Sequence, residues 1–442
     1  MSTTLLHKAT IVTMNELDEI LVGDVLLMDE KIVSVGKEIP EYEAETTVIE
    51  AKGKLLLPGF VQTHIHLCQT LFRGQADDMA LMDWLRKRVW PLEAAHDEDS
   101  VYYSALLGIG ELLCSGTTTI LDMETVSHTD SAFQAMASSG IRAISGKVMM
   151  DAGGDVPLGL QEQTQHSVEE STRLLEKWNG YDGGRLGYAY CPRFVVSCSE
   201  QLLTEVRDLS AHYNVLVHTH AAENLEEIEL VQSQRGMRNI VYLDHIGLTS
   251  PRLVLAHCIW LDEQEREILR RTGTKMTHCP GSNLKLASGI AMVPELMEQG
   301  VEVGIGADGA PCNNTLDMFQ EMRLTALLHK VRCGPESMDA RKVLRMATIG
   351  GARTLGLDHL IGSIEIGKKA DLVLLDLNDF HTFPSYEADP YSRVVYAASR
   401  SNVDSVWVDG KRVVERGKVR TVDKRVVLKE ADRSIARLLK RI

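Results

Sequence analysis

Residues 200–220 have the sequence EQLLTEVRDLSAHYNVLVHTH, and this stretch contains the unit from which we predict the fold. Apolar side chains stand three and four positions apart over residues 200–212, which is typical of a helix with one buried face. A short run of apolar and branched residues follows over 215–220 and indicates a buried strand. The stretch therefore predicts a helix that leads directly into a strand.

The same unit recurs between Pro58 and about Leu328. Helical spacing also appears over 101–114, 262–272 and 315–330. Eight apolar runs are expected to be strands: 59–63, 117–122, 142–148, 185–190, 215–220, 253–257, 274–278 and 301–306. Alternating strands and helices imply a parallel sheet, and eight repeats imply a closed (β/α)8 TIM barrel of the α/β class. An open doubly wound sheet is the alternative, but the sequence lacks the Gly-rich turn that normally follows its first strand.

The two ends of the chain have a different pattern. Strand-like runs separated by charged turns fill most of residues 1–57, and the same style returns from about residue 362. A weak internal similarity relates DVLLMDEKIVSVG (24–36) to SVWVDGKRVVERG (405–417). We therefore predict that residues 1–57 and 362–442 form one small flanking β-sandwich domain, with the barrel over 58–361. Two unrelated extensions are the alternative.

Composition restricts the class of protein. The chain has 442 residues with 47 Lys and Arg against 62 Asp and Glu, a net charge of −15. This acidic balance argues against nucleic acid or an anionic membrane as a partner. No apolar run approaches the roughly 18 residues of a membrane span, and the N-terminus lacks the basic flank of a signal peptide. Eight Cys without a CxxC pair suggest reduced thiols, so we expect a cytoplasmic protein.

Side chains of the kinds that bind metals stand at the ends of five predicted strands. Barrel enzymes place their chemistry at these carboxyl ends. His64 and His66 end the first strand in the sequence THIH, and residues two apart in a strand face the same side. The other strand ends carry His218 and His220, His257, His278, and Asp308. One such His is usually structural, but five strand ends of this kind favour a metal site.

Imidazole and carboxylate ligands without thiolate suit Zn²⁺, although Fe²⁺ or Mn²⁺ would also accept them. Strand spacing leaves open whether His218 or His220 is the ligand, because both face one side. A catalytic metal needs an open position for water and a group that moves its proton. Glu223 lies three residues after His220 and is our candidate for that group. The alternative is an ordinary acidic residue in the first turn of a helix.

Five motifs, in this order, resemble the amidohydrolase superfamily in its deaminase and chlorohydrolase branch: LLLPGFVQTHIHL (55–67), HTHAAE (218–223), LAHC (255–258), HCPGSNLKLASG (278–289) and GADGAPCNN (306–314). The resemblance extends over essentially the whole chain. It implies a hydrolase acting on carbon–nitrogen bonds of cyclic amidines, and homo-oligomers are common among such barrels. It also implies one metal ion, because RLGYAYC (185–191) offers no further Lys or Glu ligand at the fourth strand. The implied ligands are His64, His66, His220 and Asp308.

The resemblance also implies catalytic roles. Glu223 would take a proton from the activated water and deliver it to a ring nitrogen of a heteroaromatic substrate. His257 would stabilise the developing oxyanion. Asp308 would accept the remaining proton and pass it to the departing amine, so that ammonia leaves.

Further segments resemble deaminases of 5′-substituted adenosines, namely 5′-deoxyadenosine, methylthioadenosine and S-adenosylhomocysteine: VWPLE (89–93), SNLKLASGIAMVPELM (282–297) and NNTLDMFQEMRL (313–324). This resemblance implies that Glu93 binds the ribose hydroxyls, although an acidic surface residue is the alternative. Trp84 and Trp90 would close the pocket over a purine nucleoside, or simply pack beside it.

One segment departs from that pattern. CPRFVVSCSE (191–200) has Arg193 where deaminases of methylthioadenosine and adenosylhomocysteine usually have His, and it resembles guanine deaminases instead. We predict that Arg193 and His278 contact the substrate; structural roles for both are the alternative. The second hypothesis is therefore a guanine-type base or an atrazine-like s-triazine as substrate. A non-catalytic protein with a structural metal is the third, and it would leave Glu223 without a use.

Overall fold

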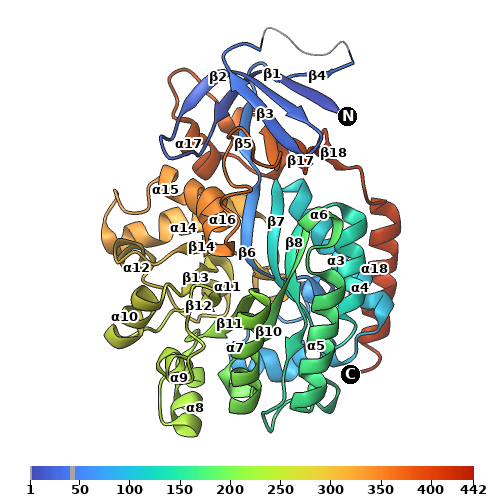
Figure 1. The fold of residues 1–442 in the computed structure, drawn as a ribbon, viewed down its shortest axis with the longest axis vertical. Coiled ribbons are helices and arrows are strands. Elements are labelled where there is room, and N and C mark those ends of the chain that lie inside the picture. The colour runs from blue at the N-terminus through green and yellow to red at the C-terminus, as the bar shows by residue number, and fades with distance from the viewer. Residues whose placement is uncertain (1, 40–44) are drawn as a thin grey trace.

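The centre of the molecule is a closed barrel of parallel strands, seen in a computed structural model that describes residues 2–39 and 45–442 (Figure 1). Each strand is hydrogen-bonded to the next, and the pairing of β14 with β6 closes the ring. The eight predicted strands are all confirmed, as β6 Phe60–His66, β7 Thr117–Met123, β8 Arg142–Gly146, β10 Leu186–Pro192, β11 Leu216–Ala221, β12 Leu253–His257, β13 Lys275–His278 and β14 Val303–Ile305. Two short strands, β9 Val148–Met149 and β15 Asp308–Gly309, extend the same sheet.

Helices cover the outside of the barrel. Those predicted from apolar spacing are confirmed as α3 Glu98–Cys114, α7 Glu200–Tyr213, α10 Glu263–Thr272 and α14 Met318–Cys333. The remaining long barrel helices are α4 Thr129–Ser139, α5 Thr164–Trp178 and α8 Leu225–Arg235. Shorter helices stand in the loops at the strand ends: α1 Leu81–Trp84, α2 Trp90–Ala94, α9 Asn239–His245 and α11 Pro280–Lys285.

The stretch 200–220 shows how sequence determines these elements. Ser199 caps the start of α7, because its side chain accepts a hydrogen bond from the Leu202 backbone N–H at 3.0 Å. Leu202, Leu203 and Val206 form the buried face of the helix. The helix ends at Asn214, whose φ of 51° is a left-handed conformation that Asn tolerates. The chain then turns into β11, which carries two His side chains into the barrel.

The small domain is built from both ends of the chain, as predicted. Its sheet contains β1 Thr3–Val12, β2 Ile20–Met28, β3 Lys31–Gly36, β4 Thr47–Glu50, β5 Leu55–Pro58, β16 Leu372–Leu375, β17 Val403–Val408, β18 Lys411–Glu415 and β19 Lys418–Val419. β5 pairs antiparallel with β16, where Leu57 lies opposite Val373. Residues 1 and 40–44 lie outside the described residues, and the boundaries at 58 and 361 stay a prediction.

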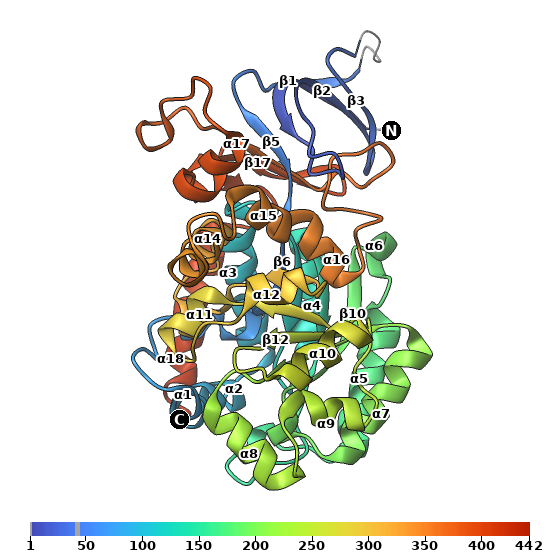
Figure 2. The same ribbon diagram turned by 90° about the vertical axis from the view of Figure 1, so that its left-hand side faces the viewer.

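The small domain and the barrel mouth lie at opposite ends of the molecule. Figures 1 and 2 show the small domain above the barrel and helix α8 at the lower end, and Figure 2 also shows the short helices α1 and α2 there. The last helix, α18 Lys424–Leu438, runs along α3 on the barrel side. Its Leu438 packs in a cluster with Phe72 and Leu92, so the chain end supports the segments next to the mouth.

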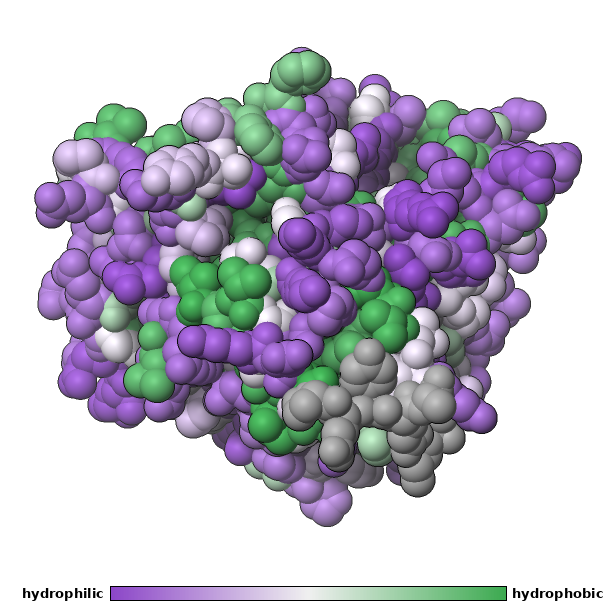
Figure 3. All heavy atoms as spheres, turned by 90° about the horizontal axis from the view of Figure 1, so that it is seen from above, coloured by the Kyte–Doolittle hydropathy of each residue, from purple (hydrophilic) through white to green (hydrophobic). Residues whose placement is uncertain are grey.

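The top face, formed by the small domain, is mainly hydrophilic. Where the structure describes it, polar groups separate the hydrophobic ones (Figure 3). Scattered apolar residues of this kind are ordinary on protein surfaces. Within the described residues, no helix is both long and apolar enough to cross a membrane.

Candidate metal centre and active site

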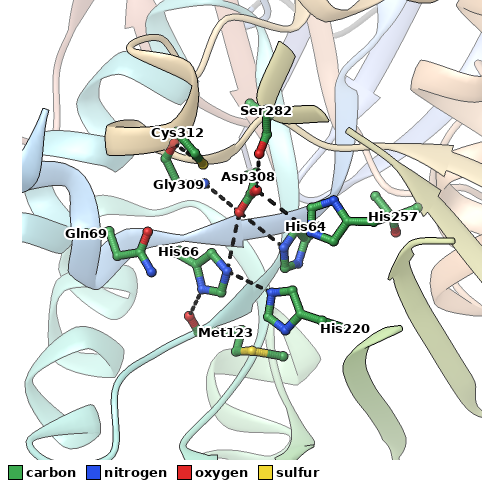
Figure 4. Close-up of polar contacts among 12 residues, drawn as sticks. His64, His66, Gln69, Met123, His220, His257, Ser282, Asp308, Gly309 and Cys312 are labelled. Atoms are coloured by element: carbon green, nitrogen blue, oxygen red, sulfur yellow. Dashed lines mark hydrogen bonds and ion pairs between the residues drawn. The ribbon is translucent and has the colours of Figure 1, made fainter. Parts of the chain in front are cut away.

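Three imidazoles and one carboxylate converge at the carboxyl ends of the barrel strands. His64 and His66 come from β6, His220 from β11, and Asp308 from the short strand β15 beside β6 (Figure 4). The Asp308 Oδ1 atom lies 3.3 Å from Nε2 of His64 and 3.3 Å from Nε2 of His66. Nε2 of His66 is 3.2 Å from Nε2 of His220. The structure therefore brings together the four side chains that the family resemblance implied.

The hydrogen bonds behind these rings fix which nitrogen faces the centre. Nδ1 of His66 lies 2.8 Å from the Met123 carbonyl oxygen, and Nδ1 of His220 lies 2.7 Å from the Arg193 carbonyl oxygen. A carbonyl only accepts, so each Nδ1 carries the proton and each Nε2 presents a lone pair. The two Nε2 atoms are 3.2 Å apart, and their lone pairs repel each other unless a cation lies between them. The donor set thus fits a metal ion, with second ring nitrogens anchored as is usual for metal ligands.

His218 supports His64 from behind. Nδ1 of His218 is 3.0 Å from the Val254 carbonyl oxygen, so its Nε2 accepts a hydrogen bond from His64 Nδ1 at 2.7 Å. His64 Nε2 is buried and has no hydrogen-bond partner among the described residues, which leaves it to bind a metal. The geometry thus distinguishes the two His of β11, which strand spacing left equivalent: His220 faces the centre, and His218 contacts His64.

Asp308 is held in a conformation that requires support. Its φ of 63° is left-handed, which costs a non-glycine residue of order 1–3 kcal/mol. Its Oδ2 accepts from Ser282 Oγ at 2.6 Å, and its Oδ1 accepts from the Gly309 N–H at 2.7 Å. Burial alone would raise the pKa of Asp308, but its close contact with the ring nitrogen of His64 outweighs burial and lowers that pKa well below its ordinary value. Asp308 is therefore a carboxylate, as a ligand must be.

The surrounding imidazoles are neutral. Burial lowers the pKa of His66 to about 3. Burial likewise lowers the pKa of His64 and of His220. Neutral imidazole is the form that binds metals, so these directions agree with the proposed ligand set.

Glu223 and His257 stand next to this centre. Glu223 Oε2 lies 3.5 Å from His257 Nε2, which in turn is 3.8 Å from Asp308 Oδ2. Burial raises the pKa of Glu223, as a group that both accepts and returns a proton requires. Burial opposes a charge on His257, but the carboxylates of Glu223 and Asp308 outweigh it and raise the His257 pKa. His257 Nδ1 is 2.8 Å from Asn283 Oδ1, so Nε2 faces the centre.

The centre opens into a cavity whose empty space, counted together with open solvent at its mouth, is about 450 Å³. Trp84, Leu81, Leu85, Phe194 and Leu286 give its walls an apolar character. The polar lining consists of His66, His220, Asp308, Glu223 and His257 together with Gln69, Arg193 and Glu227. Such a site suits a flat heteroaromatic ring with a few polar attachments.

The predicted substrate contacts Glu93 and Arg193 pair with each other. Arg193 donates to both Glu93 oxygens, at 2.5 and 3.2 Å, and Gln69 Nε2 donates to Glu93 Oε1 at 2.8 Å. Glu93 is buried on α2 rather than exposed, with Arg193 and Gln69 between it and the cavity. The pair neutralises charge that would otherwise be costly to bury.

Other predicted residues lie farther from the cavity. His278 is fully buried and packs against His329 of α14, with ring centroids 5.2 Å apart, and it is absent from the cavity lining. Trp90 is buried on α2 in the same apolar cluster as the lining residue Trp84, and it does not line the cavity. The predicted contact through His278 stays a prediction.

Sequence reasoning missed three polar residues of the site. Gln69 lies three residues after His66, Glu227 lies four after Glu223, and Ser288 Oγ donates to Glu223 Oε1 at 3.1 Å. Proximity in sequence to a ligand or to Glu223 was a usable signal for the first two. Ser288 lies within the quoted motif HCPGSNLKLASG (278–289), but nothing in that motif distinguished its side chain.

Comparison with known proteins identifies the family. The model of the amidohydrolase family matches residues 55–413. The chain belongs to that family. It is accordingly a hydrolase that acts on carbon–nitrogen bonds, and this agrees with the function predicted from the five motifs.

Several relatives match over nearly the full length. A 5′-deoxyadenosine deaminase of Methanobrevibacter smithii is 42% identical over 417 residues, 94% of each chain. A 5-methylthioadenosine/S-adenosylhomocysteine deaminase of Syntrophomonas wolfei is 38% identical over 95% of this chain and 94% of its own. The crystal structure of an adenosine deaminase from Xanthomonas campestris with bound zinc superposes with a TM-score of 0.90, at 31% identity and 99% coverage of both chains.

Proposed function

We propose that this protein is a metal-dependent hydrolytic deaminase of adenosine-type nucleosides, with 5′-deoxyadenosine, 5′-methylthioadenosine and S-adenosylhomocysteine as the substrates to consider. The observation that carries the proposal is the placement of Glu223 and His257 beside the ligand set, in the wall of the same cavity. The names of the 42% and 38% identical relatives support this choice of substrate.

His64, His66, His220 and Asp308 would hold one Zn²⁺, and Fe²⁺ or Mn²⁺ would also suit these ligands. Zinc in the similar adenosine deaminase structure supports the choice of metal. When bound, the metal would lower the pKa of a coordinated water molecule toward neutrality and so make it a nucleophile.

The chain's own residues supply the proton transfers. Glu223 takes one proton from the attacking water and delivers it to the ring nitrogen beside the amino-bearing carbon. His257 donates a hydrogen bond from Nε2 and so stabilises negative charge that develops on the incoming oxygen. Asp308 takes the second water proton and passes it to the amine. The C–O bond forms, the C–N bond breaks, and ammonia leaves.

The part of the cavity wall at Arg193 would recognise the sugar. Arg193 lines the cavity, whereas Glu93 is paired to it and lies outside the lining. Arg193 would contact the vicinal ribose hydroxyls, and Glu93 would accept from them once the approaching nucleoside opens the pair. Trp84 in the cavity wall supplies a flat apolar surface for the purine.

The second candidate is a guanine-type base or an s-triazine. Arg193 favours it, because a guanidinium at the cavity wall would also pair with a base carbonyl or ring nitrogen. A homo-oligomeric state and a cytoplasmic location stay predictions from the sequence.

A substrate panel on metal-analysed protein tests the proposal. We expect ammonia release from adenosine and its 5′-modified derivatives, together with the absorbance change of adenine converting to hypoxanthine, and about one metal ion per chain. If guanine or chlorotriazines turn over and every adenosine derivative fails, the nucleoside assignment is wrong.

A further inference from the structure

Glu227 is a buried carboxylate in the cavity wall that the reaction described above does not use. It is 1% exposed and is the third residue of α8, four positions after Glu223. Its Oε2 accepts a hydrogen bond from the backbone N–H of Glu223 at 2.8 Å. Its Oε1 accepts from Nδ2 of Asn239, the first residue of α9.

The turn that carries Glu223 needs such support. Ala222 has a φ of 53°, a left-handed conformation that is costly for a residue with a Cβ atom. The Ala222 carbonyl accepts hydrogen bonds from the N–H groups of Ile259 and Trp260, at 2.9 and 3.0 Å. These bonds hold the turn on its β12 side, and Glu227 holds the next peptide from the α8 side.

The Glu223 side chain is thus positioned from two directions. Ser288 binds its carboxylate, and Glu227 binds its backbone. Glu223 has to reach both the attacking water and the substrate ring, and a displacement of about 1 Å can cost about 100-fold in rate. A bond that fixes the peptide of Glu223 therefore bears directly on proton transfer.

We propose that Glu227 is a positioning residue for the proton shuttle Glu223, and that Asn239 orients Glu227 in turn. The inference rests on the proposed role of Glu223 in deamination. Glu227 acts through its oxygen as a hydrogen-bond acceptor, and it exchanges no proton with the substrate.

Two substitutions at this position separate the acceptor from the charge. Glu227→Met keeps the length of the side chain and removes the acceptor, so we expect kcat to fall about 10- to 100-fold with KM within about threefold of wild type. Glu227→Gln keeps one carbonyl oxygen for the Glu223 N–H. Asn239 Oδ1 has no partner among the described residues, so the Asn239 amide can turn over and accept from the new Gln amide. We expect this variant to keep kcat within about threefold.

The measurements are steady-state kinetics with the best nucleoside of the panel, metal content and thermal melting of each variant. Glu229→Gln, an exposed change on the same helix, is the matched control and should behave as wild type. Wild-type kcat in Glu227→Met would overturn the inference. So would a raised KM with unchanged kcat, which would make Glu227 a ligand contact.

An exchange of side chains tests the same inference if Glu227→Met does not fold. Asn239→Asp sets two carboxylates against each other and should lower kcat several-fold. The double variant Glu227→Gln/Asn239→Asp restores one amide and one carboxylate and should regain most of that loss, whereas equal kcat values in both would overturn the inference. Failure of the proposed function looks different, because Glu223→Gln would then keep its activity or no nucleoside would react.

Discussion

His218 and His220 have the same side-chain chemistry, but their hydrogen-bond partners give them different positions in the site. His220 presents Nε2 to the centre, whereas His218 uses Nε2 to accept from His64. Substitution of His218 should therefore leave the proposed ligand set complete but leave His64 Nδ1 without its partner. The difference between the two histidines comes from the orientation of their rings, and the sequence HTH alone does not reveal that orientation.

We expect His218→Leu to weaken metal binding about 10- to 100-fold, because partners of this kind orient a ligand and raise its basicity. The measurement is a competition titration with a chelator. At saturating metal, kcat should stay much closer to wild type than the metal Kd does. His212→Asn, an exposed change on α7, serves as the control. An unaltered metal Kd in His218→Leu would show that the hydrogen bond to His64 is unimportant.

Glu223→Gln should keep the metal and the fold and lower kcat by about 10²- to 10⁴-fold, the usual contribution of a positioned general acid–base group. The amide fills the same space but cannot take a proton from water. Metal analysis and circular dichroism establish that the variant is intact, and ammonia release gives the rate. A variant that retains wild-type kcat would remove Glu223 from the mechanism.

At the scale of elements, helix α14 buries an imidazole that has lost its hydrogen bonds to water. Both ring nitrogens of His329 are buried without a partner among the described residues, and His278 of β13 faces it in the same condition. Burial lowers the pKa of His329 to about 4, with the charge of Arg332 as the next cause. This histidine therefore stays neutral in the folded protein at pH values where the unfolded chain binds a proton.

The sign of the pH effect follows from that difference. Between about pH 6.5 and 4 the unfolded state takes up a proton at residue 329 and the folded state does not, so wild type loses stability as the pH falls. His329→Leu removes this loss. We expect the free energy of unfolding of the variant, measured relative to wild type, to be about 2 kcal/mol higher at pH 5 than at pH 8.

Urea denaturation at the two pH values measures the effect. His245→Gln, on the exposed surface of α9, is the control and should show no such difference. A gain for His329→Leu that is the same at pH 5 and pH 8 would mean that His329 already binds its proton in the folded state.

How far the elements could be predicted depended on their periodicity. Strands such as β11 and helices such as α7 have strict apolar spacing, so their existence and type followed from the sequence. The contacts between side chains that are distant in sequence did not follow from the sequence. Glu93 was expected on an exposed surface or at the ribose, and its bond to Arg193 joins residues 100 positions apart. Likewise, the contact between Glu227 and Asn239 depends on how α8 meets α9 in space, which no local pattern contains.

At the scale of the whole molecule, one buried ion pair joins the barrel to the small domain. Arg142 at the start of β8 donates to Asp371 at 2.7 and 3.0 Å and to Asp409 at 2.5 Å. The side chains of Arg142 and Asp371 are only 3% and 1% exposed. This contact lies at the amino end of the strand, away from the candidate metal centre, where residues serve stability rather than catalysis.

We expect Arg142→Met to lower the unfolding free energy by about 3–5 kcal/mol, because it leaves a buried carboxylate without its counter-charge. The kcat measured below the melting temperature should be unchanged. Arg173→Met, which breaks an exposed pair with Glu170, should cost at most about 1 kcal/mol and serves as the control. Thermal or urea unfolding decides, and equal losses in the two variants would contradict the expectation.

The pairing of β5 with β16 has a further consequence for biosynthesis. Leu57 lies opposite Val373, so the first strands of the small domain leave the ribosome more than 300 residues before their neighbours exist. At about 5–20 residues per second, the apolar edge of β5 stays uncovered for tens of seconds in each nascent chain. Newly made protein should therefore depend on molecular chaperones during translation, although the finished enzyme keeps this edge completely covered.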